Sequence, residues 1–203
     1  MFTGIVTDLG TILSIEDIPA GKRTRIRTSY DTDGFDIGAS IACEGVCHTV
    51  TAKQNAPEGN WFDIESAAET LALTTVSEWK VGQQLNLERS LTMGAELGGH
   101  LVLGHVDGMA RVVKREDHPD SVYLQFEATA ETAPFIAKKG SVALNGTSLT
   151  VNEVDGLLFS VFLIPHTLEV TTWSDRQVGD NINLEVDMMA RYAARLAEFT
   201  KTG

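Results

Sequence analysis

One short phrase occurs twice in this chain, about a hundred residues apart, and this repetition constrains the fold more than any other feature of the sequence. Residues 41–50 read IACEGVCHTV and residues 142–151 read VALNGTSLTV. Three further matches keep the same order: GIV at 4–6 with GHV at 104–106, TLALTT at 70–75 with TLEVTT at 167–172, and VGQQLNLE at 81–88 with VGDNINLE at 178–185. Such ordered matches indicate a tandem duplication. We therefore predict two small domains of one fold, at residues 1–96 and 97–187.

Each copy has the pattern of an antiparallel β-domain. Its short segments are rich in β-branched residues and partly alternate, as in KRTRIRTSY, SIACEG and WFDIESA. Glycine-containing turns such as APEGN separate them. About six strands in each copy predict a small closed barrel, because closure removes the exposed edges of a sheet. The predicted fold class is all-β, with two tandem six-stranded antiparallel barrels.

The segment MMARYAARLAEF at 188–199 has no partner in the first copy. Its apolar residues recur at helical spacing on one face: Met189, Tyr192, Ala193, Leu196 and Phe199. We predict a C-terminal helix and tail over residues 188–203. The apolar stripe fits either an interface between subunits or a helix that folds back on its own barrel.

Charge and composition exclude several classes of partner. The formal net charge of −12 repels phosphate backbones, so we expect no nucleic-acid partner. No apolar run approaches the roughly 20 residues of a membrane-spanning helix, and the start MFTGIVTDLG lacks the features of a secretory signal. We therefore expect a cytoplasmic protein with no membrane partner. Its two cysteines, Cys43 and Cys47, would be free thiols there.

The differences between the copies indicate chemistry. The first hairpin carries Cys47, His48 and Thr49, and the second carries Ser148, Leu149 and Thr150 at the equivalent places. Another difference sets Ile5 in the first copy against His105 in the second. A duplicated domain that exchanges a thiol for a hydroxyl suggests two similar pockets with unequal roles. Two such pockets suit two similar molecules.

Four segments together resemble the riboflavin synthase alpha-chain family: MFTGIV at 1–6, GGHLVLGHVDG at 98–108, GTSLTV at 146–151 and LIPHTLEVTT at 163–172. The resemblance runs from Met1 to about Arg195. It implies two Greek-key barrels and a C-terminal helix that joins three subunits into a homotrimer, with association with lumazine synthase as a further expectation. The implied reaction is a dismutation of two 6,7-dimethyl-8-ribityllumazine molecules. One donates a four-carbon unit to the other, giving riboflavin and 5-amino-6-ribitylamino-uracil, without a cofactor or metal.

The resemblance also implies site residues, carried over by position. In the first copy the substrate-binding residues are Phe2, Gly4, Ile5, Val6, Cys47, His48, Thr49, Glu65, Ser66, Ala67, Ala68, Glu69 and Thr70. In the second copy they are Gly104, His105, Val106, Lys139, Ser148, Leu149, Thr150, Phe162, Leu163, Ile164, Pro165, His166 and Thr167. The positions linked to activity are Ser40, Cys47, Thr49, His105, Ser148, Thr150 and Asp187. Asn145 stands where related sequences have an acid, which puts a proton-transfer role for this position in doubt.

Plainer interpretations stay open for several of these residues. Cys47 also fits a small buried apolar residue, the commonest place of a free cysteine. Asp187 also fits a cap for the C-terminal helix. The cysteines and histidines match no common zinc spacing, so we expect no metal. The alternative function is a lumazine- or flavin-binding protein of the fluorescent antenna type, which has the same double barrel but does not turn its chromophore over.

Overall fold

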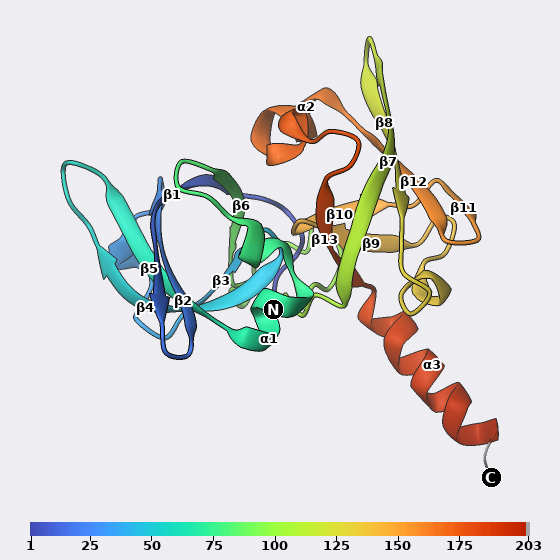
Figure 1. Ribbon diagram of the computed structural model, residues 1–203, viewed down its shortest axis with the longest axis horizontal. Coiled ribbons are helices and arrows are strands. Elements are labelled where there is room, and N and C mark those ends of the chain that lie inside the picture. Colours follow the sequence, from blue (N-terminus) through green and yellow to red (C-terminus); the bar gives the residue numbers. More distant parts are fainter. Residues whose placement is uncertain (202–203) are drawn as a thin grey trace.

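Turn residues divide the chain into short strands, and the computed structural model, which describes residues 1–201, forms two β-domains side by side (Figure 1). The first domain contains β1 (Asp8–Ile18), β2 (Gly21–Thr28), η1 (Thr32–Gly34), β3 (Ser40–Cys43), β4 (Val46–Gln54), β5 (Asn60–Ala67), α1 (Ala68–Leu73), η2 (Thr75–Glu78) and β6 (Gln84–Arg89). The second contains β7 (Gly108–His118), β8 (Ser121–Glu127), η3 (Ala133–Phe135), β9 (Ser141–Leu144), β10 (Thr147–Thr150), β11 (Glu153–Asp155), β12 (Leu158–Leu163), α2 (Pro165–Val170), η4 (Thr172–Asp175) and β13 (Asn181–Val186). The helix α3 (Met188–Lys201) follows.

The first domain is a closed antiparallel barrel with the strand order β1-β2-β5-β4-β3-β6. Strands β3, β4 and β5 follow one another, and β6 returns beside β3, which is a Greek-key arrangement. The alternating apolar residues point inward, and the interior includes Ile12, Ile26, Phe62, Ile64, Leu85 and Leu87, each at most 1% exposed. Burial of such a side chain stabilises the fold by roughly 1.5–3 kcal/mol. The prediction of a small closed barrel of six antiparallel strands is confirmed for this copy.

The second domain has the same topology but is a curled sheet instead of a closed ladder. Its strand order is β10-β9-β13-β7-β8-β12-β11. The two ends of this order, β10 and β11, are consecutive in the chain and are separated only by Val151 and Asn152. In the first domain the single strand β4 pairs with both β3 and β5, so β10 and β11 are its interrupted equivalent. The all-β prediction of two tandem domains with a C-terminal helix is confirmed, with this break as the difference.

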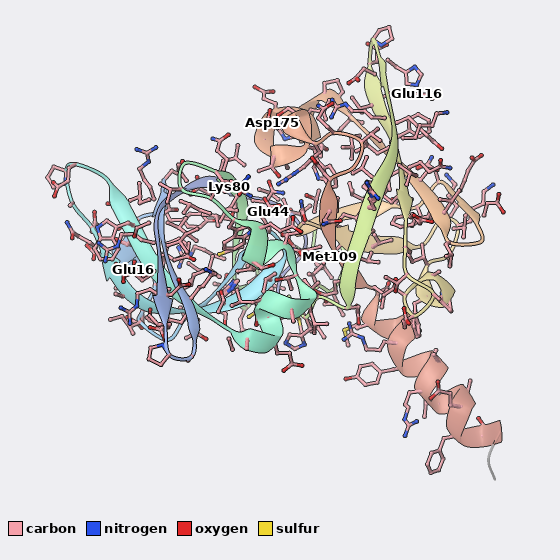
Figure 2. The ribbon with its side chains drawn as sticks, in the orientation of Figure 1. Glu16, Glu44, Lys80, Met109, Glu116 and Asp175 are labelled. Atoms are coloured by element: carbon pink, nitrogen blue, oxygen red, sulfur yellow. The ribbon has the colours of Figure 1, made fainter. Side chains whose placement is uncertain are left out.

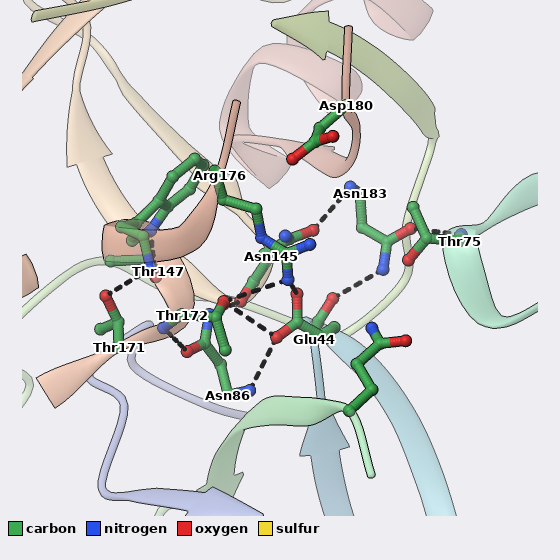
Figure 3. A network of polar contacts seen from close by, with 12 residues as sticks. Glu44, Thr75, Asn86, Asn145, Thr147, Thr171, Thr172, Arg176, Asp180 and Asn183 are labelled. Carbon is green, nitrogen blue, oxygen red and sulfur yellow. Dashed lines mark hydrogen bonds and ion pairs between the residues drawn. The ribbon is translucent and has the colours of Figure 1, made fainter. Parts of the chain in front are cut away.

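A pseudo-symmetric set of hydrogen bonds joins the two domains (Figure 3). The side-chain amide of Asn86 donates to the Asn145 carbonyl at 3.0 Å, and that of Asn183 donates to the Glu44 carbonyl at 2.8 Å. The side-chain oxygens of these asparagines accept from the other domain, from Thr172 N and Thr75 N respectively, both at 2.8 Å. All four amide and carbonyl partners are buried, so the joint is satisfied on both sides.

One ion pair breaks this symmetry. Glu44 is 1% exposed and contacts Arg176 at 2.9 Å, and burial raises the pKa of Glu44 while Arg176 opposes that rise. The equivalent position in the second copy is Asn145, whose Oδ1 accepts from Asn183 N at 2.8 Å. The residue that corresponds to Arg176 is Trp79, which supplies no cation. A carboxylate at Asn145 would therefore be buried without a counter-charge, which explains the amide in this chain.

The C-terminal helix begins at Met188 and extends away from the second domain (Figure 1). The Asp187 carboxylate accepts from Met189 N at 2.9 Å, so it caps the helix. Arg191 contacts Asp107 at 2.8 Å and ties the first turns to the domain. The predicted stripe is exposed, with Met189 at 67%, Tyr192 at 59%, Leu196 at 71% and Phe199 at 74%. The helix thus does not fold back over its barrel; residues 202 and 203 of the predicted tail lie outside the described residues. No helix within residues 1–201 is long and apolar enough to cross a bilayer.

Candidate active site

The segment at the start of each copy lies against the hairpin of the other copy. Ser148 N donates to the Gly4 carbonyl at 2.7 Å, and Cys47 N donates to the Gly104 carbonyl at 2.9 Å. Both glycines have positive φ, 75° and 76°, and a Cβ on either would lie 2.5 Å from the Cβ of Ser148 or Cys47. Only glycine permits both the backbone conformation and this approach. The repeated glycine of GIV and GHV therefore serves the contact between copies.

This crossing corrects the grouping of site residues by repeat. The sequence placed residues 4–6 in one pocket with Cys47 and residues 104–106 in another with Ser148, whereas the structure exchanges the partners. The reason lies in an antiparallel bridge between Phe2 and Val102, which are almost fully buried and bonded to each other in both directions, at 2.7 and 3.1 Å. The two bridged segments run past each other, so each one reaches the hairpin of the other copy. Phe2 is thus a buried residue of the joint.

A cavity of about 280 Å³ lies beside Cys47. Its walls come from both copies, with Val46, Cys47, Glu69, Thr70, Leu73 and Thr74 from the first and Gly104, His105 and Val106 from the second. Most of these residues belong to the predicted set, and the structure brings them together. The volume lies near the lower end of small-molecule pockets, and the lining mixes apolar side chains with a thiol, hydroxyls, a carboxylate and an imidazole.

Beside Ser148 lies His100, a histidine that is not among the predicted site residues. His100 Nδ1 and Ser148 Oγ share a hydrogen bond of 2.7 Å. Its other ring nitrogen, Nε2, is buried and has no hydrogen-bond partner among the residues that the structure describes. Burial lowers the pKa of His100, and the charge of Asp187 opposes that shift. The imidazole next to this hydroxyl is therefore disposed to be neutral, the form that can accept a proton; its place in GGHLVLGHVDG was the signal in the sequence.

His48 points away from the Cys47 cavity into the first barrel. The ring is 4% exposed, and its Nδ1 lies 3.0 Å from the Val46 carbonyl, so Nδ1 carries the proton. Its Nε2 then accepts from Ser66 Oγ at 2.9 Å. Desolvation lowers the pKa of His48 to about 4. In the second copy two buried leucines, Leu149 and Leu163, take these places, so here a hydrogen bond replaces apolar packing.

The other predicted residues lie either in the two strand pairs β3–β4 and β9–β10 or at exposed positions of the surface. Ser40 lies opposite Thr49 in the β3–β4 pair, and Thr150 lies opposite Ser141 in the β9–β10 pair. Glu65 forms a surface ion pair with Arg23 at 2.8 Å. The exposed rim positions are Ile5, Ala67, Ala68, Phe162, Ile164, Pro165 and His166, with Lys139 exposed at a left-handed φ of 66°.

A larger cleft of about 720 Å³ lies between the domains. Its lining is polar and charged, and Figure 2 labels Lys80 from the first domain and Asp175 from the second among its side chains. It contains none of the predicted site residues. The smaller Cys47 cavity is the better candidate, because it combines a thiol, an imidazole and a hydroxyl. Within residues 1–201, no cluster of three or more histidine, cysteine or acidic side chains could hold a metal ion.

Comparison with known proteins places these features in context. The model of the lumazine binding domain matches residues 3–90 and 103–187. The riboflavin synthase of Brucella abortus is 54% identical over 202 residues, covering 99% of this chain and all of that protein. The riboflavin synthase of Photobacterium phosphoreum is 37% identical and covers 97% of this chain and 88% of that protein. Among solved structures, LumP complexed with riboflavin has a TM-score of 0.78 at 23% identity, covering 92% of this chain and 99% of that one, and so shares the fold.

Proposed function

The chain belongs to the lumazine-binding domain family, and from this premise we propose that it acts as a riboflavin synthase. The observation that carries the proposal is 54% identity to a riboflavin synthase over 99% of this chain and all of that protein. The reaction is a dismutation of two 6,7-dimethyl-8-ribityllumazine molecules. One gives a four-carbon unit to the other, so riboflavin and 5-amino-6-ribitylamino-uracil together contain every atom of the two substrates. The balance therefore needs no oxidant, reductant or second substrate.

Two pockets of the same origin suit this chemistry. Each would hold one flat ring, and holding the two rings together converts a bimolecular step into an effectively intramolecular one, which can contribute roughly 7–11 kcal/mol. The lumazine 7-methyl group is acidic because its anion delocalises into the electron-poor ring. The protein then has to bind and orient two rings and move protons.

The residues beside the two hairpins supply the groups for those steps. We assign the Cys47 thiol, the Thr49 hydroxyl and His105 to one pocket, and Ser148, Thr150 and His100 to the other. The His100–Ser148 hydrogen bond of 2.7 Å supports a proton-moving role for this pair. The thiol of Cys47 is partly exposed at the cavity, which supports a role as a nucleophile or hydrogen-bond donor. Ser40 and Asp187 are assigned to positioning, since Ser40 lies opposite Thr49 and Asp187 caps α3.

Assembly is the next part of the proposal. Two rings react only if they meet face to face, and we propose that a pocket of one subunit faces a pocket of another. We propose a homotrimer in which α3 makes the contact, supported by its exposed apolar stripe. Lumazine synthase is a candidate partner because it would supply the substrate. The proposed location is the cytoplasm, consistent with two free cysteines.

The second candidate is a protein that binds lumazine without turnover. The fold shared with LumP, with TM-scores of 0.77 and 0.78 for its lumazine and riboflavin complexes, favours it. The identity of 22–23% to LumP is far below the 54% to a riboflavin synthase, which favours the enzyme. Mixing the purified protein with 6,7-dimethyl-8-ribityllumazine and following the absorption spectrum separates the two. Growth of the riboflavin spectrum supports the enzyme, and a stable lumazine spectrum overturns that assignment in favour of the binding protein.

A further inference from the structure

The repeated phrases VGQQLNLE and VGDNINLE each end in a buried glutamate, Glu88 and Glu185, that the proposed reaction does not use. Glu185 is 2% exposed, and its two carboxylate oxygens accept from Leu103 N at 2.7 Å and Gly104 N at 2.8 Å. It therefore holds two successive backbone N–H groups with one side chain. Hydrogen bonds to an ionised acceptor are about twice as strong as neutral ones.

Glu88 does the same in the other copy. It is 6% exposed and accepts from Thr3 N at 2.7 Å and Gly4 N at 2.9 Å, with a further 2.7 Å bond from the Thr3 hydroxyl. The two carboxylates thus accept hydrogen bonds from the backbone of equivalent segments in the two copies. Burial raises the pKa of each glutamate, and in each case the backbone hydrogen bonds oppose that rise.

Of the two glycines held in this way, Gly104 lines the Cys47 cavity and Gly4 has the equivalent place beside Ser148. Gly104 lies against Cys47 and Gly4 lies against Ser148, through hydrogen bonds of 2.9 and 2.7 Å. A chain of contacts therefore runs from Glu185 through Gly104 to Cys47, and another from Glu88 through Gly4 to Ser148. Each glutamate holds a glycine of its own domain, and that glycine contacts the hairpin of the other domain.

We propose that Glu185 and Glu88 are positioning residues that set the two pockets crosswise: Glu185 fixes the wall beside Cys47, and Glu88 fixes the wall beside Ser148. This explains why the glutamate recurs at the end of both phrases although it faces the interior. The crossed arrangement also makes each pocket depend on both domains. As far as turnover is concerned the inference rests on the proposed function, but the geometry of the walls can be tested without it.

The first test measures the wall directly through the Cys47 thiol. In Glu185→Gln one carboxylate oxygen becomes an NH₂ group, which faces a backbone N–H and cannot accept from it. The segment at Gly104 then opens more often, and we expect the rate of Cys47 labelling by a thiol reagent to rise about fivefold. Glu88→Gln should leave that rate within about twofold of the parent, because its wall is the other one.

Controls make this result specific. The Cys47→Ser variant reports any labelling of the buried Cys43, and Glu153→Gln changes an exposed glutamate on β11 that touches neither wall. If Glu185→Gln does not fold, Glu185→Asp withdraws both oxygens by one methylene while keeping the charge, and it should raise labelling in the same way. Equal labelling in the Glu185 and Glu88 variants, or no change in either, overturns the crosswise assignment.

The second test uses turnover of 6,7-dimethyl-8-ribityllumazine in double-mutant cycles. Glu185→Gln should be non-additive with Cys47→Ser and additive with Ser148→Ala, while Glu88→Gln should show the reverse. We expect a deviation from additivity of about fivefold in kcat/KM within the matched pairs. A glutamate that only stabilises the fold would lower the melting temperature with no pair-specific coupling, and that outcome overturns the proposal. If the parent protein produces no riboflavin, the proposed function fails, and the labelling test still decides the role of the glutamates.

Discussion

Glu44 and Arg176 form an ion pair of 2.9 Å across the joint between the two domains, with the Glu44 side chain almost fully buried. The same joint holds Asn145 and Trp79 at the two equivalent positions, so only one half of the pseudo-symmetric contact is charged. The relative orientation of the two domains therefore depends in part on this one ion pair. The bridge between Phe2 and Val102 and the exchanged asparagine bonds add contacts that carry no net charge.

Removing the cation should therefore destabilise the protein strongly. In Arg176→Met the Glu44 carboxylate is left buried without its partner, and we expect a loss of about 3 kcal/mol in the free energy of unfolding. Urea denaturation followed by tryptophan fluorescence measures it. The double variant Glu44→Gln/Arg176→Met removes both charges and should recover most of the loss. A single variant as stable as the parent would show that the pair contributes nothing to the joint.

His48 should make the protein sensitive to acid. Its pKa is lowered to about 4 in the folded state from the usual value near 6.5, so the unfolded chain takes up a proton more readily. The contribution to stability is full above about pH 6.5 and is lost progressively as the pH falls toward 4, by about 3 kcal/mol in total. His48→Leu/Ser66→Ala, which resembles the apolar pair of the second copy, should lose less stability between pH 7 and pH 4 in denaturant titrations.

The exposed His118 provides the control for that measurement. His118→Gln removes one exposed imidazole and should give the parental dependence of stability on pH if the buried ring is the cause. The same slope in the His48 variant and the parent would mean that other groups cause the acid sensitivity.

Cys47 should be needed for turnover but not for folding. Cys47→Ser keeps a small polar side chain against Gly104, while a hydroxyl ionises far less readily than a thiol and is a weaker nucleophile. We expect kcat to fall at least about tenfold with a change in melting temperature of only a few degrees. Parental turnover of lumazine by this variant would leave the thiol without a special role.

The C-terminal helix should be needed for assembly. Ending the chain after Asp187 removes the stripe of exposed apolar side chains and leaves both β-domains intact. A helix of this length is marginal alone and needs packing partners. The truncated protein should bind lumazine, sediment as a monomer and produce almost no riboflavin. Full turnover by a monomer would show that one chain builds the whole active site.

The sequence alone was enough to predict the duplicated fold, the strands and which polar residues lie at the two hairpins. These follow from local rules: alternating burial predicts strands, and glycine with polar residues predicts turns. The stripe from Met189 to Phe199 likewise predicted α3, because helical periodicity is a property of the segment itself. Even the break between β10 and β11 changed only how one predicted strand is divided.

Only the tertiary structure decided which repeat completes which pocket. Gly4 meets Ser148 and Gly104 meets Cys47 because the segments bridged at Phe2 and Val102 run past each other. The two copies carry nearly the same motif. Alignment of one copy with the other therefore groups each N-terminal segment with the hairpin of its own copy. Partners far apart in sequence are chosen by packing between the domains, which leaves no periodic signal in either segment. The His100–Ser148 and Glu185–Gly104 hydrogen bonds each join residues of one domain that lie far apart in sequence, so they too became visible only in the folded structure.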